Sequence, residues 1–200
     1  MIDIRDRILA AAVRVYAEHG FRGTTTRLVA TAAAVNEVTL FRHFGTKEAL
    51  ITAALSRLES TSRLPPLGEP IDPAAEVGAW ASALFHHWHD SRRLVCQVMG
   101  DMLHHPELAP AVCAEPDCEH HKLTAYLERM RAAGLAPAEF RSEAAAGLLL
   151  GAIFTHAMWR EHFETADLPP VATVITSYVA LMLNAIGYPP TGNRPLKEPA

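Results

Sequence analysis

Apolar residues recur along the chain at spacings of three and four, which indicates amphipathic helices. No stretch of strict apolar–polar alternation indicates a strand, and proline and glycine fall mostly between the periodic segments. The predicted fold class is therefore all-α, with about nine helices. We expect them near residues 4–19, 24–33, 37–43, 46–62, 73–90, 91–102, 117–133, 137–163 and 170–187.

Residues that favour helix ends set several of these boundaries. Thr24 or Thr25 is suited to cap the second helix, and Asn36 the third. Glycine at the left-handed position commonly ends a helix, and Gly20, Gly45 and Gly134 occupy such places. Residues 63–72 form the one linker-like stretch.

The first three helices have the proportions of a helix-turn-helix motif with its supporting helix. The second is short and offers small residues for packing, and a tight turn follows it at residues 34–36. In such motifs the N-terminal residues of the next helix reach base edges in the major groove. Asn36, Glu37 and Thr39 are short polar residues at that position. Glu37 also fits a second interpretation, as an acid favoured by the helix dipole.

Charge is distributed unevenly along a chain whose net charge is −4. Residues 1–50 carry seven Lys and Arg against five acids, whereas residues 51–200 carry eleven against seventeen. A polyanion would therefore contact the first quarter.

The motifs of residues 4–55 resemble the N-terminal domain of TetR-type repressors. The resemblance is carried by residues 8–12, 20–21, 24–25, 29–30, 35–36, 39–44 (Thr-Leu-Phe-Arg-His-Phe) and 47–50 (Lys-Glu-Ala-Leu). It implies an N-terminal DNA-binding domain at residues 1–48. It also implies a helical effector-binding and dimerisation domain at residues 49–200. Over residues 56–200 the resemblance rests on helix count and order alone.

The resemblance implies a set of DNA contacts. Thr25, His43 and Lys47 match phosphate-contacting residues, and residues 36–39 match the base-reading turn. His43 and Lys47 also fit the interpretation of ordinary surface residues. The predicted DNA-binding residues are Thr25, Arg27, Asn36, Glu37, Thr39, Phe41, Arg42, His43 and Lys47.

Two residues depart from the family pattern. Phe41 stands where the family usually has tyrosine, so a phenolic hydrogen bond to phosphate is missing while an apolar contact remains available. Ala34 stands where the family usually has glycine, at a turn position that favours positive φ. Either the turn differs slightly, or alanine there costs about 1 kcal/mol.

A stripe of aromatic and methionine residues runs through the helices of the second domain. Such a stripe is usually plain hydrophobic core, but it also suits a pocket in which a few polar groups orient a mostly hydrophobic effector. The resemblance favours the pocket. The predicted effector-binding residues are Trp80, Leu84, His87, Trp88, Met99, Met102, Tyr126, Phe154, His156, Met158 and Trp159.

Small residues in one late helix and apolar residues in the last one predict a two-fold interface between subunits. Small residues let helices approach closely, and the uncharged last helix needs cover from a second copy. The predicted interface residues are Ala144, Gly147, Gly151, Val174, Ile175, Tyr178, Leu181 and Met182. The uncharged stretch at residues 168–193 is interrupted by polar residues and prolines, so we expect no membrane span.

Histidines and cysteines supply the alternative function, a metal- or redox-responsive regulator. Cys113, Cys118, His120 and His121 lie close in sequence, although no known ligand spacing is present and surface histidines are the ordinary interpretation. The three cysteines match no disulfide framework, which favours a reducing compartment, and the N-terminus is unlike a signal peptide. No catalytic motif is present. We predict a cytoplasmic homodimeric repressor without cofactor, released from a palindromic DNA operator by a small effector.

Overall fold

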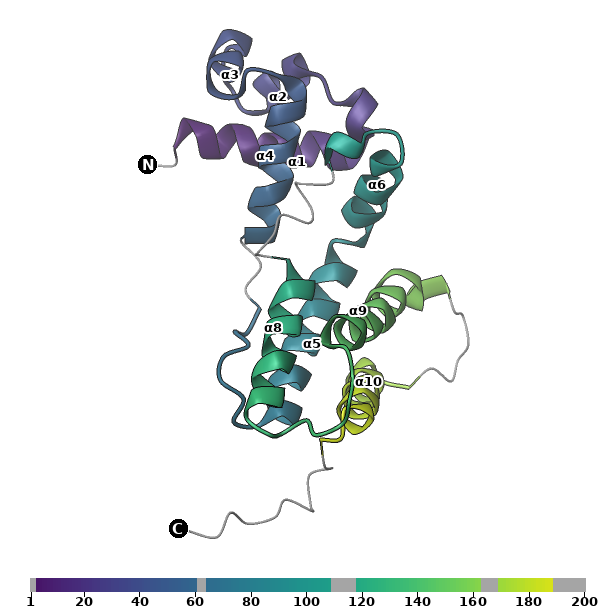
Figure 1. Ribbon diagram of the computed structural model, residues 1–200. Coiled ribbons are helices and arrows are strands. Elements are labelled where there is room, and N and C mark those ends of the chain that lie inside the picture. Colours follow the sequence, from purple (N-terminus) through teal and green to yellow (C-terminus); the bar gives the residue numbers. More distant parts are fainter. Residues whose placement is uncertain (1–2, 61–63, 109–117, 163–168, 189–200) are drawn as a thin grey trace. The chain divides into compact units, whose positions relative to one another are not determined.

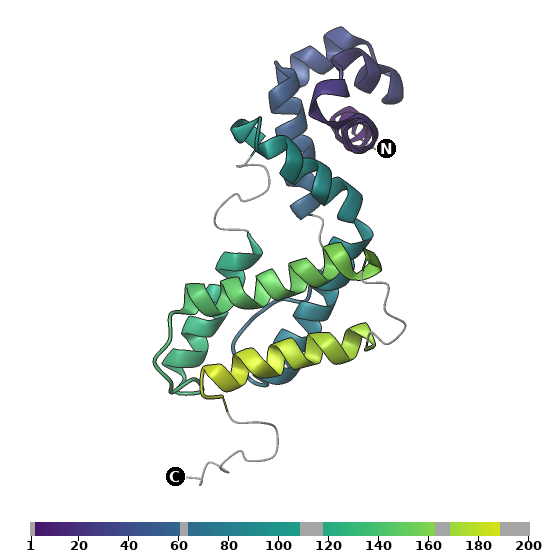
Figure 2. The ribbon, with the colours of Figure 1, turned by 90° about the vertical axis from the view of Figure 1, so that its right-hand side faces the viewer.

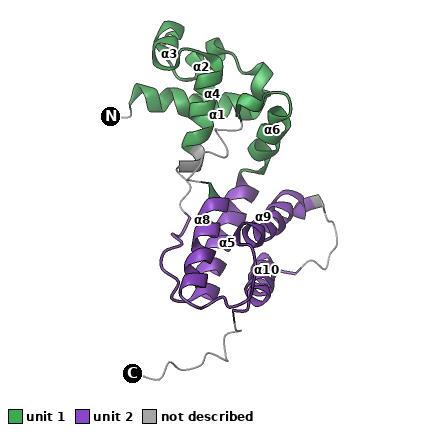
Figure 3. Cartoon of the chain, viewed as in Figure 1, with its two compact units in different colours: residues 1–62, 91–118 green, residues 63–90, 119–200 purple. Residues whose placement is uncertain are grey.

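The computed structural model describes residues 3–60, 64–108, 118–162 and 169–188. In these residues the chain forms nine α-helices, two short 3₁₀ helices and no strand, which confirms the all-α prediction. The chain divides into two compact units, residues 1–62 with 91–118 and residues 63–90 with 119–200 (Figure 3). The assignment of DNA binding to residues 1–48, and of effector binding and dimerisation to residues 49–200, stays a prediction.

Unit 1 is built around its first helix, on which α2, α4 and α6 pack (Figure 1). One apolar cluster joins the first four helices and includes Ile8, Val29, Leu40 and Leu50. A second cluster joins Tyr16 and Phe21 to residues of α4, α6 and η1. The elements of unit 1 are α1 (Ile4–Gly23), α2 (Thr26–Ala32), α3 (Glu37–Phe44), α4 (Lys47–Ser60), α6 (Arg92–Met102) and η1 (Pro106–Leu108).

Gly20 interrupts α1 at the predicted place. Its φ of 65° is positive, as expected, but its ψ of −174° is extended, so one more helical turn follows as far as Gly23. A side chain at Gly20 would collide with Gln97, because a Cβ atom there would lie 2.6 Å from the Gln97 amide nitrogen. Glycine is therefore favoured here by the positive φ, and the flexible Gln97 side chain of α6 would have to shift to admit a Cβ atom.

Unit 2 is a four-helix assembly in which α9 packs on α5 and α8, and α10 packs on α5 and α9. Figure 2 shows α9 and α10 side by side as the bright green and yellow ribbons. The core holds Trp80, Tyr126, Ile153 and Val179, all at most 3% exposed. The elements of unit 2 are α5 (Pro73–Asp90), α8 (Glu119–Ala132), α9 (Ser142–Trp159), η2 (Arg160–His162) and α10 (Val171–Ala185).

Residues 64–72, the described part of the linker-like stretch, form hydrogen bonds with the helices of unit 2. The Arg129 guanidinium donates to the Leu67 and Gly68 carbonyls at 2.7 and 3.1 Å. Glu76 accepts from the backbone N–H groups of Ile71 and Asp72 and from the Tyr126 hydroxyl. Burial alone would raise the pKa of Glu76, but these hydrogen bonds outweigh it and lower the pKa.

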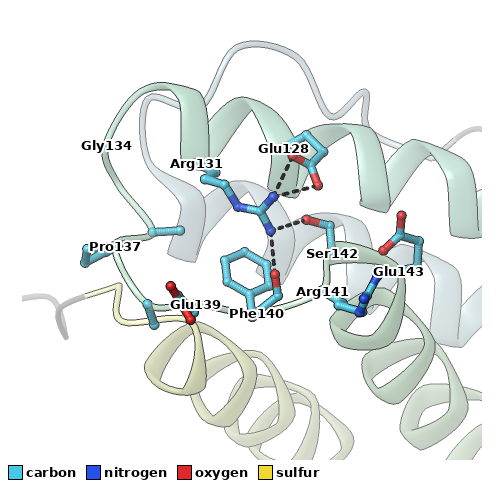
Figure 4. Close-up of a pocket in the computed structure, with 11 residues that line it drawn as sticks. Glu128, Arg131, Gly134, Pro137, Glu139, Phe140, Arg141, Ser142 and Glu143 are labelled. Atoms are coloured by element: carbon cyan, nitrogen blue, oxygen red, sulfur yellow. Dashed lines mark hydrogen bonds and ion pairs between the residues drawn. The ribbon is translucent and has the colours of Figure 1, made fainter.

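The helix predicted from residue 137 begins only at Ser142, so that boundary was wrong. Arg131 holds the preceding residues in an extended loop (Figure 4). Its guanidinium donates to Glu128, to the Phe140 carbonyl and to the Ser142 hydroxyl, and it lies 4.6 Å from the centre of the Phe140 ring. These contacts outweigh the tendency of Pro137 to begin a helix.

Within the described residues, no helix combines the length and hydropathy that crossing a bilayer requires.

Candidate nucleic-acid interface

The turn between α2 and α3 packs through small side chains. Ala30 and Ala33 are at most 5% exposed, and Leu40 on the inner face of α3 is fully buried. The Val35 N–H donates to the Ala30 carbonyl at 3.0 Å, which closes the turn. The predicted packing of a short second helix on the third is therefore present.

Ala34 adopts the positive φ, 52°, that the resemblance implied for glycine at this position. The Arg7 guanidinium braces the turn by donating to the carbonyls of Ala33 and Ala34 at 2.8 and 3.1 Å. The sequence left two outcomes open, a slightly different turn or an unchanged turn that is strained by alanine. The positive φ of Ala34 corresponds to the second. Arg7 was not singled out from the sequence, because its partners lie 26 and 27 residues away.

Side-chain caps fix the starts of both helices. The Thr25 hydroxyl accepts from the Leu28 N–H at 3.2 Å, and the Asn36 carboxamide oxygen accepts from the Val38 N–H at 2.8 Å. Both were predicted as caps. Thr24, the other candidate, is fully buried and donates to the Gly20 carbonyl instead. Capping leaves the Thr25 hydroxyl proton available to an acceptor such as phosphate.

Glu37 links the two helices of the motif. Its carboxylate accepts from the Thr26 hydroxyl in the first turn of α2. The side chain is half-buried, so it has an internal role beside the helix-dipole role considered above. Base contact by Glu37 stays a prediction.

The remaining predicted contact residues gather on and around α3. Phe41 is 46% exposed, and Arg27, Arg42 and His43 are also exposed, while Thr39 is half-buried. Lys47 is half-buried, with its ammonium 4.5 Å from the centre of the Phe21 ring. This cation–π contact holds a positive charge at the start of α4.

Two exposed apolar residues of the motif were missed. Val38 in the first turn of α3 is 74% exposed and Leu28 in α2 is 43% exposed. Spacing could have identified Val38, which comes three residues before Phe41 and two before the buried Leu40. It therefore lies on the same outward face as Phe41.

The helices of this interface lie in the part of the chain that matches a known protein family. The sequence profile of the family described as "Bacterial regulatory proteins, tetR family" matches residues 8–54, which include the whole of α2 and α3. Residues 8–54 are therefore similar to the N-terminal region of TetR-type regulators.

Curated relatives each match part of the chain. The HTH-type transcriptional regulator UidR of Escherichia coli strain K12 is 30% identical over 108 residues, 52% of this chain and 55% of that protein. The HTH-type transcriptional repressor Rv3405c of Mycobacterium tuberculosis strain H37Rv is 41% identical over 56 residues, 28% of this chain and 30% of that protein. The chain thus aligns with about half of UidR and less of Rv3405c.

Solved TetR-type structures share the fold over most of the chain. The protein described as flavonoid-responsive regulator FrrA superposes with a TM-score of 0.74 at 21% identity, covering 91% of this chain and 96% of that one. UidR and Rv3405c are named as a transcriptional regulator and a transcriptional repressor, not as enzymes.

Eight of the eleven predicted effector residues occupy buried or half-buried positions in unit 2. Trp80, Leu84, Tyr126 and Met158 are buried, and the Trp80 indole N–H donates to the Glu119 carboxylate at 3.2 Å. The half-buried side chains are His87, Trp88, Phe154 and His156. Trp88 and Phe154 meet edge to face with ring centres 5.5 Å apart.

The surroundings of His156 disfavour its protonation. Burial, the nearby Arg160 guanidinium and His89 together lower its pKa. A guanidinium nitrogen of Arg160 lies 2.8 Å from His156 Nε2, which must accept because the guanidinium only donates. The His156 ring also contacts Phe85 and Tyr178.

The other three predicted effector residues, Met99, Met102 and Trp159, do not lie in the interior of unit 2. Met99 and Met102 belong to α6, which is part of unit 1. Met102 packs there against the cluster around Tyr16, and Met99 is 49% exposed. Trp159 ends α9 with 53% of its surface exposed. Periodicity identifies the apolar face of a helix, but not which unit covers that face.

The predicted interface residues lie on α9 and α10. Most are exposed or half-buried, and two are buried. Ala144, Gly147 and Gly151 are exposed, and Leu181 is 67% exposed. Val174 and Tyr178 are half-buried. Ile175 and Met182 are instead 2% and 8% exposed, so their side chains belong mainly to the core of unit 2. A groove of about 380 Å³ between the two helices is lined by Ala144, Leu148, Tyr178, Leu181 and Met182, among others.

The described residues lend no support to a metal site at the Cys/His cluster. Cys113 lies outside the described residues. The His120 Nε2 atom is 3.0 Å from the Glu143 carbonyl, and the described ranges contain no group of three His, Cys, Asp or Glu side chains that could hold a metal ion.

Proposed function

We propose that the chain is a homodimeric transcriptional repressor that binds a palindromic DNA operator through α2 and α3. The observation that carries the proposal is the exposed surface of α3, with Phe41, Arg42 and His43 beside the Thr25 cap. Arg27 and Lys47 extend the positive charge of this surface. Cations of this kind neutralise phosphates, while residues in the first turn of such a helix contact base edges.

Further support for DNA binding comes from the family match at residues 8–54 and from the names of its relatives. One of these, Rv3405c, is named as a repressor. Repression by this chain is part of the proposal on that ground.

A second copy of the chain is the proposed partner of α9 and α10. Leu148 and Leu181 are 76% and 67% exposed on these helices, and α10 carries no charged residue. Exposed glycine and alanine on α9 permit close helix approach. A two-fold dimer presents two copies of α3, which suits two half-sites about one DNA turn apart.

The proposed signal is a small, mostly hydrophobic effector bound in unit 2 beside Trp88 and Phe154. These rings are half-buried, and His87 and His156 supply polar groups nearby. A protein with the same fold, FrrA, is described as flavonoid-responsive. The effector releases DNA by binding more tightly to a state of the dimer that fits the operator poorly.

The DNA assignment is tested by selecting duplexes from a random-sequence pool with the purified chain. We expect one palindromic sequence to be enriched. Thr39→Ala should then change the preference among its variants, because base contacts specify sequence. Leu103→Ala, at an 83% exposed leucine of unit 1 outside α3, is the matched control and should leave the preference unchanged. A pool without any enriched sequence would refute the proposal.

Effector binding is tested by a thermal-shift screen that begins with flavonoids. A compound that raises the melting temperature and releases the selected duplex is expected to lose both effects in Trp88→Ala. Equal responses of the parent protein and this variant would contradict the placement beside Trp88.

A further inference from the structure

Val38 in the first turn of α3 is 74% exposed, more than Phe41 at 46%. Nothing in the fold of unit 1 explains an apolar side chain at this position. Valine is also a poorer helix former than alanine, because its branched side chain loses rotamer freedom. Val38 therefore costs helix stability without contributing to the described core.

The polar groups around Val38 are already engaged within the motif. The Val38 N–H donates to the Asn36 carboxamide oxygen, and the Glu37 carboxylate accepts from Thr26. With these bonds made, the exposed methyl groups of Val38 face outward in the first turn of α3. Phe41 follows one turn later on the same face, and is 46% exposed.

The surroundings of this apolar pair identify its partner. Arg42 is exposed in the next turn and Arg27 is exposed on α2, so cationic side chains accompany the pair. An apolar patch beside cations complements the major groove, in which phosphates border the base edges. Among those edges, the thymine 5-methyl group is the apolar feature, and the other bases present donors and acceptors.

We propose that Val38 is a specificity-determining residue that reads a thymine 5-methyl group, with Phe41 completing the apolar contact. This inference rests on the proposed function, because it needs α3 to enter the major groove. It adds that part of the operator preference is carried by an apolar contact rather than by hydrogen bonds.

The test replaces each thymine of the selected duplex by deoxyuridine, which lacks only the methyl group. At one position in each half-site we expect about a fourfold loss of affinity for each methyl removed, the effect of burying one methylene-sized group. Val38→Ala should weaken binding of the thymine duplex, and its affinities for the thymine and deoxyuridine duplexes should be nearly equal. Val38→Thr, which keeps one methyl group, should give an intermediate ratio.

Two controls make the result decisive. Alanine favours the helix, so we expect Val38→Ala to fold like the parent protein. An unchanged circular dichroism spectrum and melting temperature would show that any loss of binding does not come from misfolding. Leu103→Ala removes another exposed apolar side chain of unit 1 and should keep the full thymine preference.

The two proposals fail in different ways. If no duplex is enriched, the proposed function is refuted. If a duplex is enriched but no thymine methyl matters, or if Val38→Ala keeps the full thymine preference, the assignment of Val38 is refuted alone.

Discussion

Ala34 has a φ of 52°, a left-handed conformation that residues with a Cβ atom adopt at a cost. Replacing it by glycine removes that cost, although the unfolded chain becomes more flexible. We expect Ala34→Gly to raise the free energy of unfolding by roughly 0.5–1 kcal/mol. Urea unfolding followed by circular dichroism measures this difference.

Ala32 provides the matched control, because it is an exposed alanine in α2 with helical geometry. Ala32→Gly should lower the free energy of unfolding by roughly 0.5–1 kcal/mol. If both glycine variants were destabilised, the strain assigned to Ala34 would be absent.

The stability of unit 2 should depend on the protonation of His156. Burial, Arg160 and His89 lower the pKa of His156, so the folded state binds this proton less readily than the unfolded state. Stability rises with pH wherever the unfolded state binds more protons, so it should fall as the pH drops through the ordinary histidine value of about 6.5. His156→Gln should flatten this dependence. Melting temperatures between pH 5 and 8 give the comparison, and an equally steep profile in the variant would contradict it.

At the scale of elements, Asp101 fastens α6 to α1. Its carboxylate accepts from the Tyr16 hydroxyl at 2.8 Å, the Phe21 N–H at 2.9 Å and the Gln97 amide at 3.1 Å. Burial would raise the pKa of Asp101, but these hydrogen bonds and His105 outweigh it and lower the pKa. The stabilisation is therefore present above about pH 4 and is lost as the pH falls through the lowered value.

Asp101→Ala should destabilise unit 1 by about 2 kcal/mol, because it leaves the buried Tyr16 hydroxyl without its acceptor. Tyr16→Phe should cost about 1 kcal/mol, since the carboxylate keeps its other donors. The double variant should lose less than the sum of the two. Additive losses in chemical unfolding would show that the two groups are not coupled.

The elements that the sequence predicted well are those whose ends are set locally. Thr25 and Asn36 cap their helices, and Gly134 and Gly187 adopt positive φ beyond the ends of α8 and α10. Such signals act within four residues and can be recognised without tertiary structure. The start of α9 was missed because Arg131, outside the segment itself, holds the preceding loop extended.

The candidate site was predicted unevenly for a related reason. Polar residues such as Thr25 and Arg42 were recognised from the family motif, and both are exposed. Arg7 was not, because its contacts with the turn form only after α1 packs on α2. Met99 and Met102 were predicted to lie among the effector-binding residues, but α6, which carries them, follows α5 in sequence and packs with α1.

For the whole molecule, the proposed dimer depends on the exposed apolar surface of α9 and α10. Leu181→Asp places a charge on this surface and should convert the dimer to monomers in sedimentation velocity experiments. Operator binding should weaken with it, because one α3 reads only half a palindrome. Leu103→Asp is the control, and should sediment like the parent. A parent protein that is monomeric at micromolar concentration would contradict the proposed interface.

The central claim is that α3 and the cations around it bind DNA with sequence preference. The most direct measurement is the affinity of the parent protein and of Lys47→Ala for the selected duplex and for a scrambled duplex, over a series of salt concentrations. The parent should prefer the selected duplex by at least about 10³-fold. Lys47→Ala should weaken binding to both duplexes alike and reduce the salt slope by about one, as loss of one phosphate contact requires. Equal affinity of the parent for both duplexes, with a salt slope unchanged in Lys47→Ala, would contradict the account.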